Sequence, residues 1–492
     1  MKKSVIPFFL ILLLVSTSYS CFEDRDDNGA FASEISDFVW KGLNFWYLYK
    51  DEISDLANDR FSSNEQFADY LNLFSGPEEL FQSLKYQPQT VDKYSRILDD
   101  YIAFEQLLEG CTVRSGYEIN FYLVPGSNTD IFGVVRLVLP GSNADAAGLE
   151  RGQLFYGVDG TSLNNNNINE LFSSDSYTIN LASYDDNETT ETNDDTIIQE
   201  SETISLTKAS FCEDPIYKTD ILTIEGENVA YLMYNGFVSE YNNQLNAVFA
   251  DFKSNNVQHL VLDLRYNPGG SVNTSILLAS LITGQFTGEI HSTEQWNSDI
   301  QTAFFNQNPE NLINRFTNTL NNNPINSLSL NEVYILTTGD SASASELLIN
   351  TLNPYIDVIH IGTTTEGKYQ GSITLYDSEN FQRNGANPNH TYAMQPLVLK
   401  LANTVGFTDY SEGLNPDIVI SENPQNYGIL GNENEPLLAR ALSEISMSNN
   451  PIYPNEVVIP FTTSNSFEPF LNEMIIDKKI PEELINKLSF KK

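Results

Sequence analysis

The stretch LVLDLRYNPGGS, residues 260–271, joins a short apolar run to a turn with two adjacent glycines. The apolar run at 260–265 predicts a buried strand, and the residues after the turn predict a helix that continues to Leu281. Glycines at 269 and 270 allow backbone N–H groups to approach another chain closely, because no side chain stands in the way. A strand, a glycine turn and a helix in this order are typical of an α/β domain.

The same alternation of strand and helix patterns extends on both sides of this stretch, from residue 229 to about residue 443. Strands are predicted at 229–234, 332–338 and 358–361, and helices at 238–254 and 342–352. The Asn-rich segment 284–330 interrupts the alternation and is interpreted as a lid or an insertion. We therefore predict an α/β domain over residues 213–449.

The run SASASE, residues 341–346, opens the helix predicted at 342–352. Its middle serine, Ser343, would stand in the first turn, where unpaired N–H groups and the positive end of the helix favour a developing negative charge. Ser343 is thus a candidate nucleophile, and the small alanines on either side leave room for a substrate backbone. Taken alone, the run is also explained as a serine-rich N-cap without chemistry.

A serine nucleophile needs a base, and the sequence offers a lysine for that role. Ser343 lacks the flanking glycines of the G-x-S-x-G motif. None of the four histidines stands in a motif; they are His259, His291, His360 and His390. Lys368 ends the segment GTTTEGK, residues 362–368, and Ser-Lys dyads are an established variant of nucleophile activation. The lysine must be neutral to accept a proton, which a dry pocket favours, whereas a lysine in a glycine turn is also explained as an ordinary surface residue.

A separate pattern of short strands precedes the α/β domain. The segment GVVRLVLPGSNADAAGLERGQLFYGVDG, residues 133–160, predicts a strand, a Pro-Gly turn, a short helix, a second turn and another strand. This order resembles a PDZ domain, placed at 111–212, although Asn143 and Gln153 replace the Pro and Asp that are usual there. PDZ domains bind a peptide C-terminus as an added strand, which implies that the loop at Gly116 and Tyr117 holds the carboxylate.

Three motifs in order behind a PDZ domain resemble the carboxyl-terminal processing, or tail-specific, serine protease family. They are DLRYNPGG at 263–270, SASASE at 341–346 and GTTTEGK at 362–368, and the resemblance spans residues 115–420. It implies a crotonase-like (ClpP-like) α/β protease domain in which Ser343 is the nucleophile and Lys368 the base. It further implies an oxyanion hole made by the N–H groups of Gly269 or Gly270 and of Ala344.

The chain departs from the family pattern close to both catalytic candidates. Pro354 stands where the family has an acidic residue, eleven positions after the nucleophile. The family's glutamine after the lysine is matched by Gln370 only if the turn is remodelled, so Gln370 is a possible orienting residue. These differences concern the residues that support the dyad and not the dyad itself.

The remaining segments complete a multidomain α+β architecture. Residues 31–110 carry apolar side chains at helical spacing, including a stretch from Tyr94 to Tyr101, and predict an N-terminal helical region. Residues 185–202 are acidic and rich in Thr and Asn, and they predict an exposed hairpin. Residues 450–492 predict a small C-terminal extension with a terminal helix.

The N-terminal end of the sequence predicts export. A basic pair precedes an apolar run at 5–15 that is too short to span a bilayer, as in a signal peptide over residues 1–20. Cys21 resembles the acylated cysteine of a bacterial lipoprotein and is followed by a tether at 21–30, while ordinary cleavage near Ser20 is the alternative. We therefore expect a protein held in the bacterial cell envelope by a lipid anchor only.

Cys111 and Cys212 bracket the predicted PDZ domain, whose termini are expected to lie close together. In an oxidising compartment this placement favours a disulfide, although two separate buried thiols also fit the sequence. The three cysteines include no C-x-x-C pair and the histidines form no H-E-x-x-H motif, so we expect no metal site.

The charge of the chain excludes one class of function. The 492 residues include 26 Lys and Arg against 66 Asp and Glu, a formal net charge of −40, which opposes binding to nucleic acid. We expect an exported serine endopeptidase that cleaves unstructured or C-terminally exposed polypeptides and needs no cofactor. The alternatives are a non-catalytic PDZ peptide-binding adaptor on a decayed protease fold, or another hydrolase or ligand-binding module on the same fold.

Overall fold

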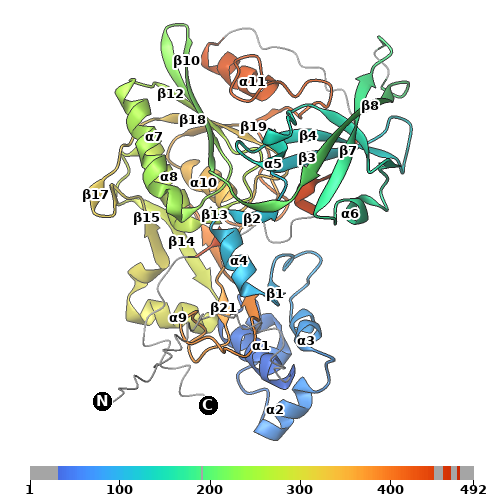
Figure 1. Ribbon diagram of the computed structural model, residues 1–492. Coiled ribbons are helices and arrows are strands. Elements are labelled where there is room, and N and C mark those ends of the chain that lie inside the picture. The colour runs from blue at the N-terminus through green and yellow to red at the C-terminus, as the bar shows by residue number, and fades with distance from the viewer. Residues whose placement is uncertain (1–31, 190–191, 448–457, 467–473, 477–492) are drawn as a thin grey trace, which may run out of the picture.

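The computed structural model describes residues 32–189, 192–447, 458–466 and 474–476, and Figure 1 shows the arrangement of their elements. The signal peptide and Cys21, and the helix expected at the C-terminal end, lie outside the described residues. In the figure, the N-terminal helices gather at one end of the molecule, and two large sheets lie at the other.

Short helices and one strand make up the N-terminal region. They are α1 (Ala32–Trp46), η2 (Lys50–Glu52), η3 (Ser54–Leu56), α2 (Asn64–Leu71), α3 (Pro77–Ser83), β1 (Arg96–Leu98) and α4 (Tyr101–Leu108), where η marks a 3-10 helix. The prediction of a helix from Tyr94 to Tyr101 is wrong, because its middle residues, Arg96–Leu98, form β1 and the helix α4 begins only at Tyr101. β1 pairs with β22 (Ala393–Gln395), and the side chain of Asp100 caps α4, so a distant strand and a local cap override the helical spacing.

An antiparallel sheet of order β25-β3-β4-β5-β7-β8 follows, with β6 paired to β5. Its strands are β3 (Tyr117–Leu123), β4 (Ile131–Val138), β5 (Leu154–Val158), β6 (Thr161–Ser162), β7 (Ser176–Asp185), β8 (Thr196–Thr207) and β25 (Pro460–Thr463). Two short helices, α5 (Asn143–Ala146) and α6 (Ile168–Leu171), contribute Ala144 and Ile168 to its core. β7 and β8 form a hairpin in the region where the sequence predicts one.

The central sheet has the order β10-β11-β12-β18-β19-β24, and its strands from β11 onward are parallel. They are β10 (Ile216–Ile224), β11 (Glu227–Tyr234), β12 (His259–Asp263), β18 (Glu332–Thr337), β19 (Asp357–Gly362) and β24 (Ile418–Val419). Alternate side chains point to opposite faces, so Ala230 and Leu232 join one core while Val229 and Tyr231 join another.

Helices bury both faces of the central sheet. α7 (Asn242–Ser254), α8 (Val272–Thr283) and α10 (Ala344–Leu352) pack on one face, and α11 (Pro436–Ile445) packs with residues of β4 on the other. The strand, turn and helix predicted from residues 260–271 are therefore present, as β12, the turn at 264–269 and α8.

A second sheet of order β13-β26-β20-β23-β14-β15 connects the central sheet to the N-terminal region. Its strands are β13 (Gly270–Ser271), β14 (Ile290–Trp296), β15 (Ile313–Arg315), β20 (Gln370–Ser372), β23 (Leu397–Ala402) and β26 (Met474–Ile475). The smaller elements nearby are η4 (Ser239–Tyr241), α9 (Ser298–Gln307), η5 (Pro309–Leu312), β16 (Thr319–Leu320), β17 (Asn323–Pro324) and β21 (Leu375–Tyr376).

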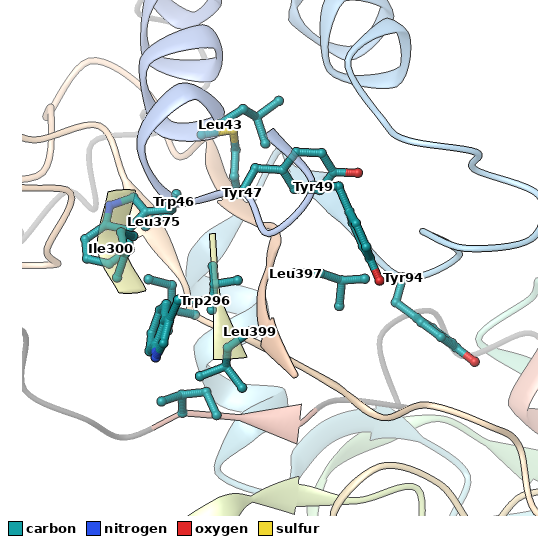
Figure 2. Packing of buried hydrophobic residues seen from close by; sticks show 14 of the residues in the cluster. Leu43, Trp46, Tyr47, Tyr49, Tyr94, Trp296, Ile300, Leu375, Leu397 and Leu399 are labelled. Carbon is teal, nitrogen blue, oxygen red and sulfur yellow. The ribbon is translucent and has the colours of Figure 1, made fainter. Parts of the chain in front are cut away.

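The segment 284–330 is an inserted part of this second sheet, and its interpretation as a lid is wrong. β14 lies between β23 and β15 as an inner strand, and α9 packs on α1. Figure 2 shows the resulting core, which contains Leu43 and Trp46 of α1, Trp296 of β14 and Leu399 of β23, with the ring centres of Trp46 and Trp296 6.3 Å apart. Burial of these large side chains fixes the N-terminal region against the sheet that carries β13 and β20.

Candidate active site

Ser343 stands at the start of α10, directly after the loop that follows β18. Its backbone has a positive φ of 63°, which is uncommon for a residue with a side chain and costs on the order of 1–3 kcal/mol. The side chain is fully buried, and its Oγ makes no hydrogen bond within the protein. A buried hydroxyl without a hydrogen-bond partner, on a strained backbone, is uncommon in folded proteins and is typical of functional sites.

The carboxylate of Glu346 joins the serine segment to the lysine segment. Its Oε2 accepts the N–H of Ser343 at 2.8 Å and the N–H of Lys368 at 2.9 Å, so both backbones meet at one oxygen atom. Oε1 accepts the N–H of Gly367 at 2.7 Å and the hydroxyl of Thr365 at 2.6 Å. Glu346 therefore fixes the two candidate catalytic residues relative to each other.

Glu346 is itself fully buried, and its ionisation is finely balanced. Burial raises the pKa of its carboxyl to about 7, while the four groups that donate to it act in the opposite direction. The ionised form is the one that accepts all four hydrogen bonds.

Lys368 is fully buried and lies against an aromatic ring from the N-terminal region. Its Nζ lies 5.1 Å from the centre of the Tyr94 ring, and the Tyr94 hydroxyl donates to Glu366 at 3.2 Å. The preceding Gly367 has φ of 98°, and a Cβ there would lie 2.4 Å from the carbonyl oxygen of Ser411. Only glycine fits at position 367, because any side chain would collide with the backbone of Ser411. This close packing places the next residue, Lys368, in the interior, away from water.

The four histidines lie away from the serine. His360 bonds with Thr337, and burial lowers its pKa to about 4; His291 is also fully buried and bonds with Thr351 and Ser292. His259 is hydrogen-bonded to Glu227 and Glu332, and His390 is hydrogen-bonded to Asp377. The structure thus offers Ser343 no histidine base.

The glycine turn after β12 reaches the same region. Gly270 has φ of 131°, and a Cβ there would lie 2.4 Å from the carbonyl oxygen of Phe237, so no other residue fits. The N–H of Gly269 donates to Oδ1 of Asn267 at 2.9 Å and is used within the turn. Of the predicted oxyanion donors, Gly270 and the helix-terminal N–H of Ala344 are the better candidates.

A buried ionic group supports this turn. Asp263 and Arg265 have no exposed surface and are joined at 2.7 Å, and Glu435 of the segment before α11 also accepts from Arg265 at 2.7 Å. Ser341 and Ser345 donate to the carbonyl oxygens of Leu264 and Asn267, which ties the serine segment to the turn.

Comparisons with known proteins match this part of the chain. Residues 228–386 match the model described as Peptidase family S41, and residues 34–96 match the Peptidase S41 N-terminal domain. A carboxyl-terminal-processing protease of Picosynechococcus is 25% identical over 353 residues, which cover 70% of this chain and 73% of that protein. These matches support membership of peptidase family S41.

A solved structure extends the likeness to the fold. A protein of Bacteroides fragilis, described as a proposed S41 protease, has a TM-score of 0.63 and 24% identity; the match covers 83% of this chain and 97% of that one. The chain therefore shares the mixed helix-and-sheet fold of an S41 protein, and the comparisons support a peptidase of serine type.

Gln370, the possible orienting residue in this S41 region, is held by the N-terminal domain. Its Nε2 donates to the hydroxyl of Tyr49 at 3.1 Å and to the carbonyl of Val91 at 3.5 Å. Its Oε1 is buried and makes no hydrogen bond, so Gln370 accepts nothing from Lys368 in the structure. Gln370 therefore contacts the N-terminal domain and does not orient Lys368 through its side-chain oxygen.

The loop predicted to hold a peptide carboxylate joins β2 (Cys111–Arg114) to β3. Gly116 has φ of 87° and its carbonyl accepts from the hydroxyl of Ser142, while Tyr117 is buried at the start of β3. A cavity of about 410 Å³ opens beside them. Cys111 pairs with Cys212 of β9 (Ala209–Cys212) as a disulfide with Cα atoms 3.9 Å apart.

Two residues of this site, Glu346 and Tyr94, are given no role in it by sequence reasoning. Glu346 has a signal, because Ser343 and Glu346 form the S-x-x-E spacing of a capping box. Tyr94 has none, because only the packing of the N-terminal domain brings it to Lys368. In the described part of the chain, no group of acidic, His or Cys side chains is arranged to hold a metal ion, and no helix has the length and apolarity needed to cross a bilayer.

Proposed function

We propose that this protein is an exported serine endopeptidase that cleaves unstructured or C-terminally exposed polypeptides, with Ser343 as nucleophile and Lys368 as base. One observation supports the dyad most directly. A single carboxylate oxygen of Glu346 binds the backbone N–H of both residues, while the Ser343 hydroxyl is buried without a partner.

In the proposed reaction, Lys368 takes the hydroxyl proton as the Ser343 oxygen attacks the carbonyl carbon of the scissile bond. The negative charge on the carbonyl oxygen is stabilised by the N–H groups of Gly270 and Ala344. Lys368 then returns the proton to the leaving amine, and water hydrolyses the ester by the same steps in reverse order. A buried lysine suits this role because burial favours its neutral form.

The proposed cleft lies beside the glycine turn. A cavity of about 490 Å³ is bordered by Gly269 and Gly270, and by the exposed carboxylates of Glu109 and Glu240. These carboxylates disfavour acidic substrate side chains and favour basic ones. The crotonase-like arrangement of the catalytic domain and the PDZ character of the β3–β8 sheet belong to the same proposal, with β3 as the strand beside which a substrate C-terminus binds.

Peptide cleavage by single variants tests the dyad. Ser343→Ala and Lys368→Ala should each remove nearly all cleavage of an unfolded reporter, because members of a coupled unit are not additive. Ser254→Ala and Lys253→Ala, two exposed changes on α7, serve as matched controls and should retain activity. Full activity of Ser343→Ala in a folded protein would refute the assignment; peptide binding without cleavage by the wild type would favour the non-catalytic adaptor.

The lipid anchor is a second part of the proposal. Cys21 is expected to be the mature N-terminus and to carry acyl chains, which mass spectrometry of the membrane fraction would detect. Cys21→Ser should release the protein from membranes. A mature N-terminus at another residue, without acyl mass, would contradict the anchor.

A further inference from the structure

A strand from the C-terminal segment lies on the outer edge of β3. β25 pairs antiparallel with β3, with Pro460 opposite Tyr122 and Thr463 opposite Asn120. At the two ends of this pairing, the N–H of Leu123 donates to the carbonyl of Ile459 at 3.0 Å and the N–H of Ile119 donates to the hydroxyl of Ser464 at 3.0 Å. The backbone groups of β3 that an added strand would use are therefore engaged by the chain itself.

The direction of β25 matches that of the peptide expected at this edge. Because it is antiparallel to β3, β25 runs toward Tyr117 and the loop at Gly116. A peptide that places its C-terminal carboxylate in that loop must run the same way. Ser464 forms part of the wall of the 410 Å³ cavity beside this loop, together with Tyr117, Ile119 and Phe172. Residues 458–466 thus occupy the strand position of a docked peptide, and the 410 Å³ cavity lies at the end of that position.

The same segment also reaches the glycine turn. β26 lies between β13 and β20, with Met474 opposite Gly270 and Ile475 opposite Ser372. β13 contains the proposed oxyanion donor, and β20 begins two residues after Lys368. Asn465 and Ile475 both border the 490 Å³ cavity at the turn. Residues 458–466 therefore lie at the docking edge, whereas β26 is an inner strand of the second sheet and borders the catalytic turn.

Polar contacts hold β25 to the loop that leads to Ser343. The hydroxyl of Thr463 and Nδ2 of Asn465 donate to Oδ1 of Asp340 at 3.2 and 3.0 Å, and Oδ1 of Asn465 accepts from Arg136 at 3.0 Å. Asp340 is also ion-paired with Arg136 of β4. These contacts of Thr463 and Asn465 form a latch between the segment, the β3 sheet and the catalytic loop.

We propose that residues 458–466, which contain β25, are an intramolecular competitor for substrate binding, so that an extended polypeptide docks on the edge of β3 only after β25 is released. The partner that fits this edge is a chain in β-conformation, running antiparallel to β3. The inference rests on the proposed function for its link to cleavage, but occupancy of the edge is measurable by binding alone.

The experiment compares three forms of the full chain: wild type, Asn465→Ala, and the double variant Ser464→Ala with Asn465→Ala. A fluorescent peptide with the sequence of residues 458–466 is the probe, read by anisotropy. Loss of the Asn465 contacts should strengthen its binding about tenfold, since hydrogen bonds to charged partners contribute about that factor. Thr462→Ala, a matched change on β25 outside the latch, should bind like the wild type.

Hydrogen exchange at Ile119 and Leu123 checks the release, and both amides should exchange faster in the double variant. Equal peptide affinity in all forms, or tight binding by the wild type, would overturn the inference. Cleavage of an unfolded reporter should show a lower KM in the released forms, by a similar factor. Stronger peptide binding by the variants without cleavage in any form would refute the proposed proteolytic function but support the competitor proposal. Cleavage with unchanged KM and unchanged peptide affinity would refute the competitor proposal alone.

Discussion

The geometry of the dyad depends on Glu346, because its two carboxylate oxygens accept four hydrogen bonds from the segments that carry Ser343 and Lys368. All four neighbouring groups are donors. In Glu346→Gln the amide NH₂ would face donors whichever way it turns. We expect kcat/KM to fall by about tenfold or more and the free energy of unfolding to fall by about 1–3 kcal/mol. Glu289→Gln, an exposed carboxylate, is the control.

The pH dependence of the free energy of unfolding provides a second test of Glu346→Gln. The pKa of Glu346 is about 7 in the folded protein, above its ordinary value of 4.5, so the folded state binds the proton more tightly. Its contribution to stability is present below pH 4.5 and is lost as the pH rises to about 7. Urea unfolding should show this loss in the wild type and not in Glu346→Gln, and parallel curves for the two would contradict the prediction.

Sequence reasoning reaches individual residues when their spacing is local. Ser343, Lys368 and Gly270 stand in short motifs, and the structure brings their segments together. Glu346 was within reach through the capping-box spacing. The contacts of Gln370 could not be predicted in this way, because its partner, Tyr49, lies far away in the sequence and no local pattern indicates such a contact.

At the scale of elements, β1 shows why periodicity alone misleads. The residues from Tyr94 to Tyr101 repeat at helical spacing, yet Arg96–Leu98 pair with β22 as a strand, and Tyr94 just before this strand contacts Lys368. Tyr94→Ala should admit water to the lysine and favour its charged form, which moves the acidic limb of the pH–activity profile to higher pH. Tyr94→Phe keeps the ring and should move the acidic limb little. Equal shifts in both variants would show that the hydroxyl of Tyr94, and not its ring, controls the protonation of Lys368.

The ribbon of β2 and β9 is a second element with a measurable role. Its disulfide joins Cys111 to Cys212 across a sequence separation of 101 residues. In the chain-entropy model a loop of this length contributes up to about 4–5 kcal/mol. Reductant should lower the urea midpoint of the wild type by a corresponding amount and leave the double variant Cys111→Ser with Cys212→Ser unchanged. Two reactive thiols at these positions in unreduced, unfolded protein would contradict the bond.

At the scale of the whole molecule, buried charges join the β3 sheet to the central sheet. Glu422 accepts from Arg151, which follows α5, at 2.8 Å and from Arg265, which follows β12, at 3.2 Å. Composition and local patterns do not predict these ion pairs, because Arg151, Arg265 and Glu422 come from three distant segments of the sequence. These ion pairs connect the two sheets, and Thr463 and Asn465 contact a second pair at the same boundary, Arg136 and Asp340.

This junction predicts a specific response to acid. Burial opposes ionisation of Glu422, but Arg151 and Arg265 outweigh it and lower its pKa to about 2. Its contribution to stability is therefore present above pH 4.5 and is lost as the pH falls toward 2. Glu422→Gln should lower the free energy of unfolding at pH 7 by about 3 kcal/mol, because it removes one of the buried carboxylates that neutralise Arg151 and Arg265.

The difference between wild type and Glu422→Gln should then narrow as the pH falls from 5 to 3, by up to about 1.4 kcal/mol per pH unit, since one fewer group titrates in the variant. Glu433→Gln, an exposed change in the same segment, should follow the wild type at every pH. A gap that stays constant with pH would show that Glu422 acts through packing and not through its charge. Because the other carboxylates are common to both proteins, the comparison isolates the ion pairs that join the two sheets.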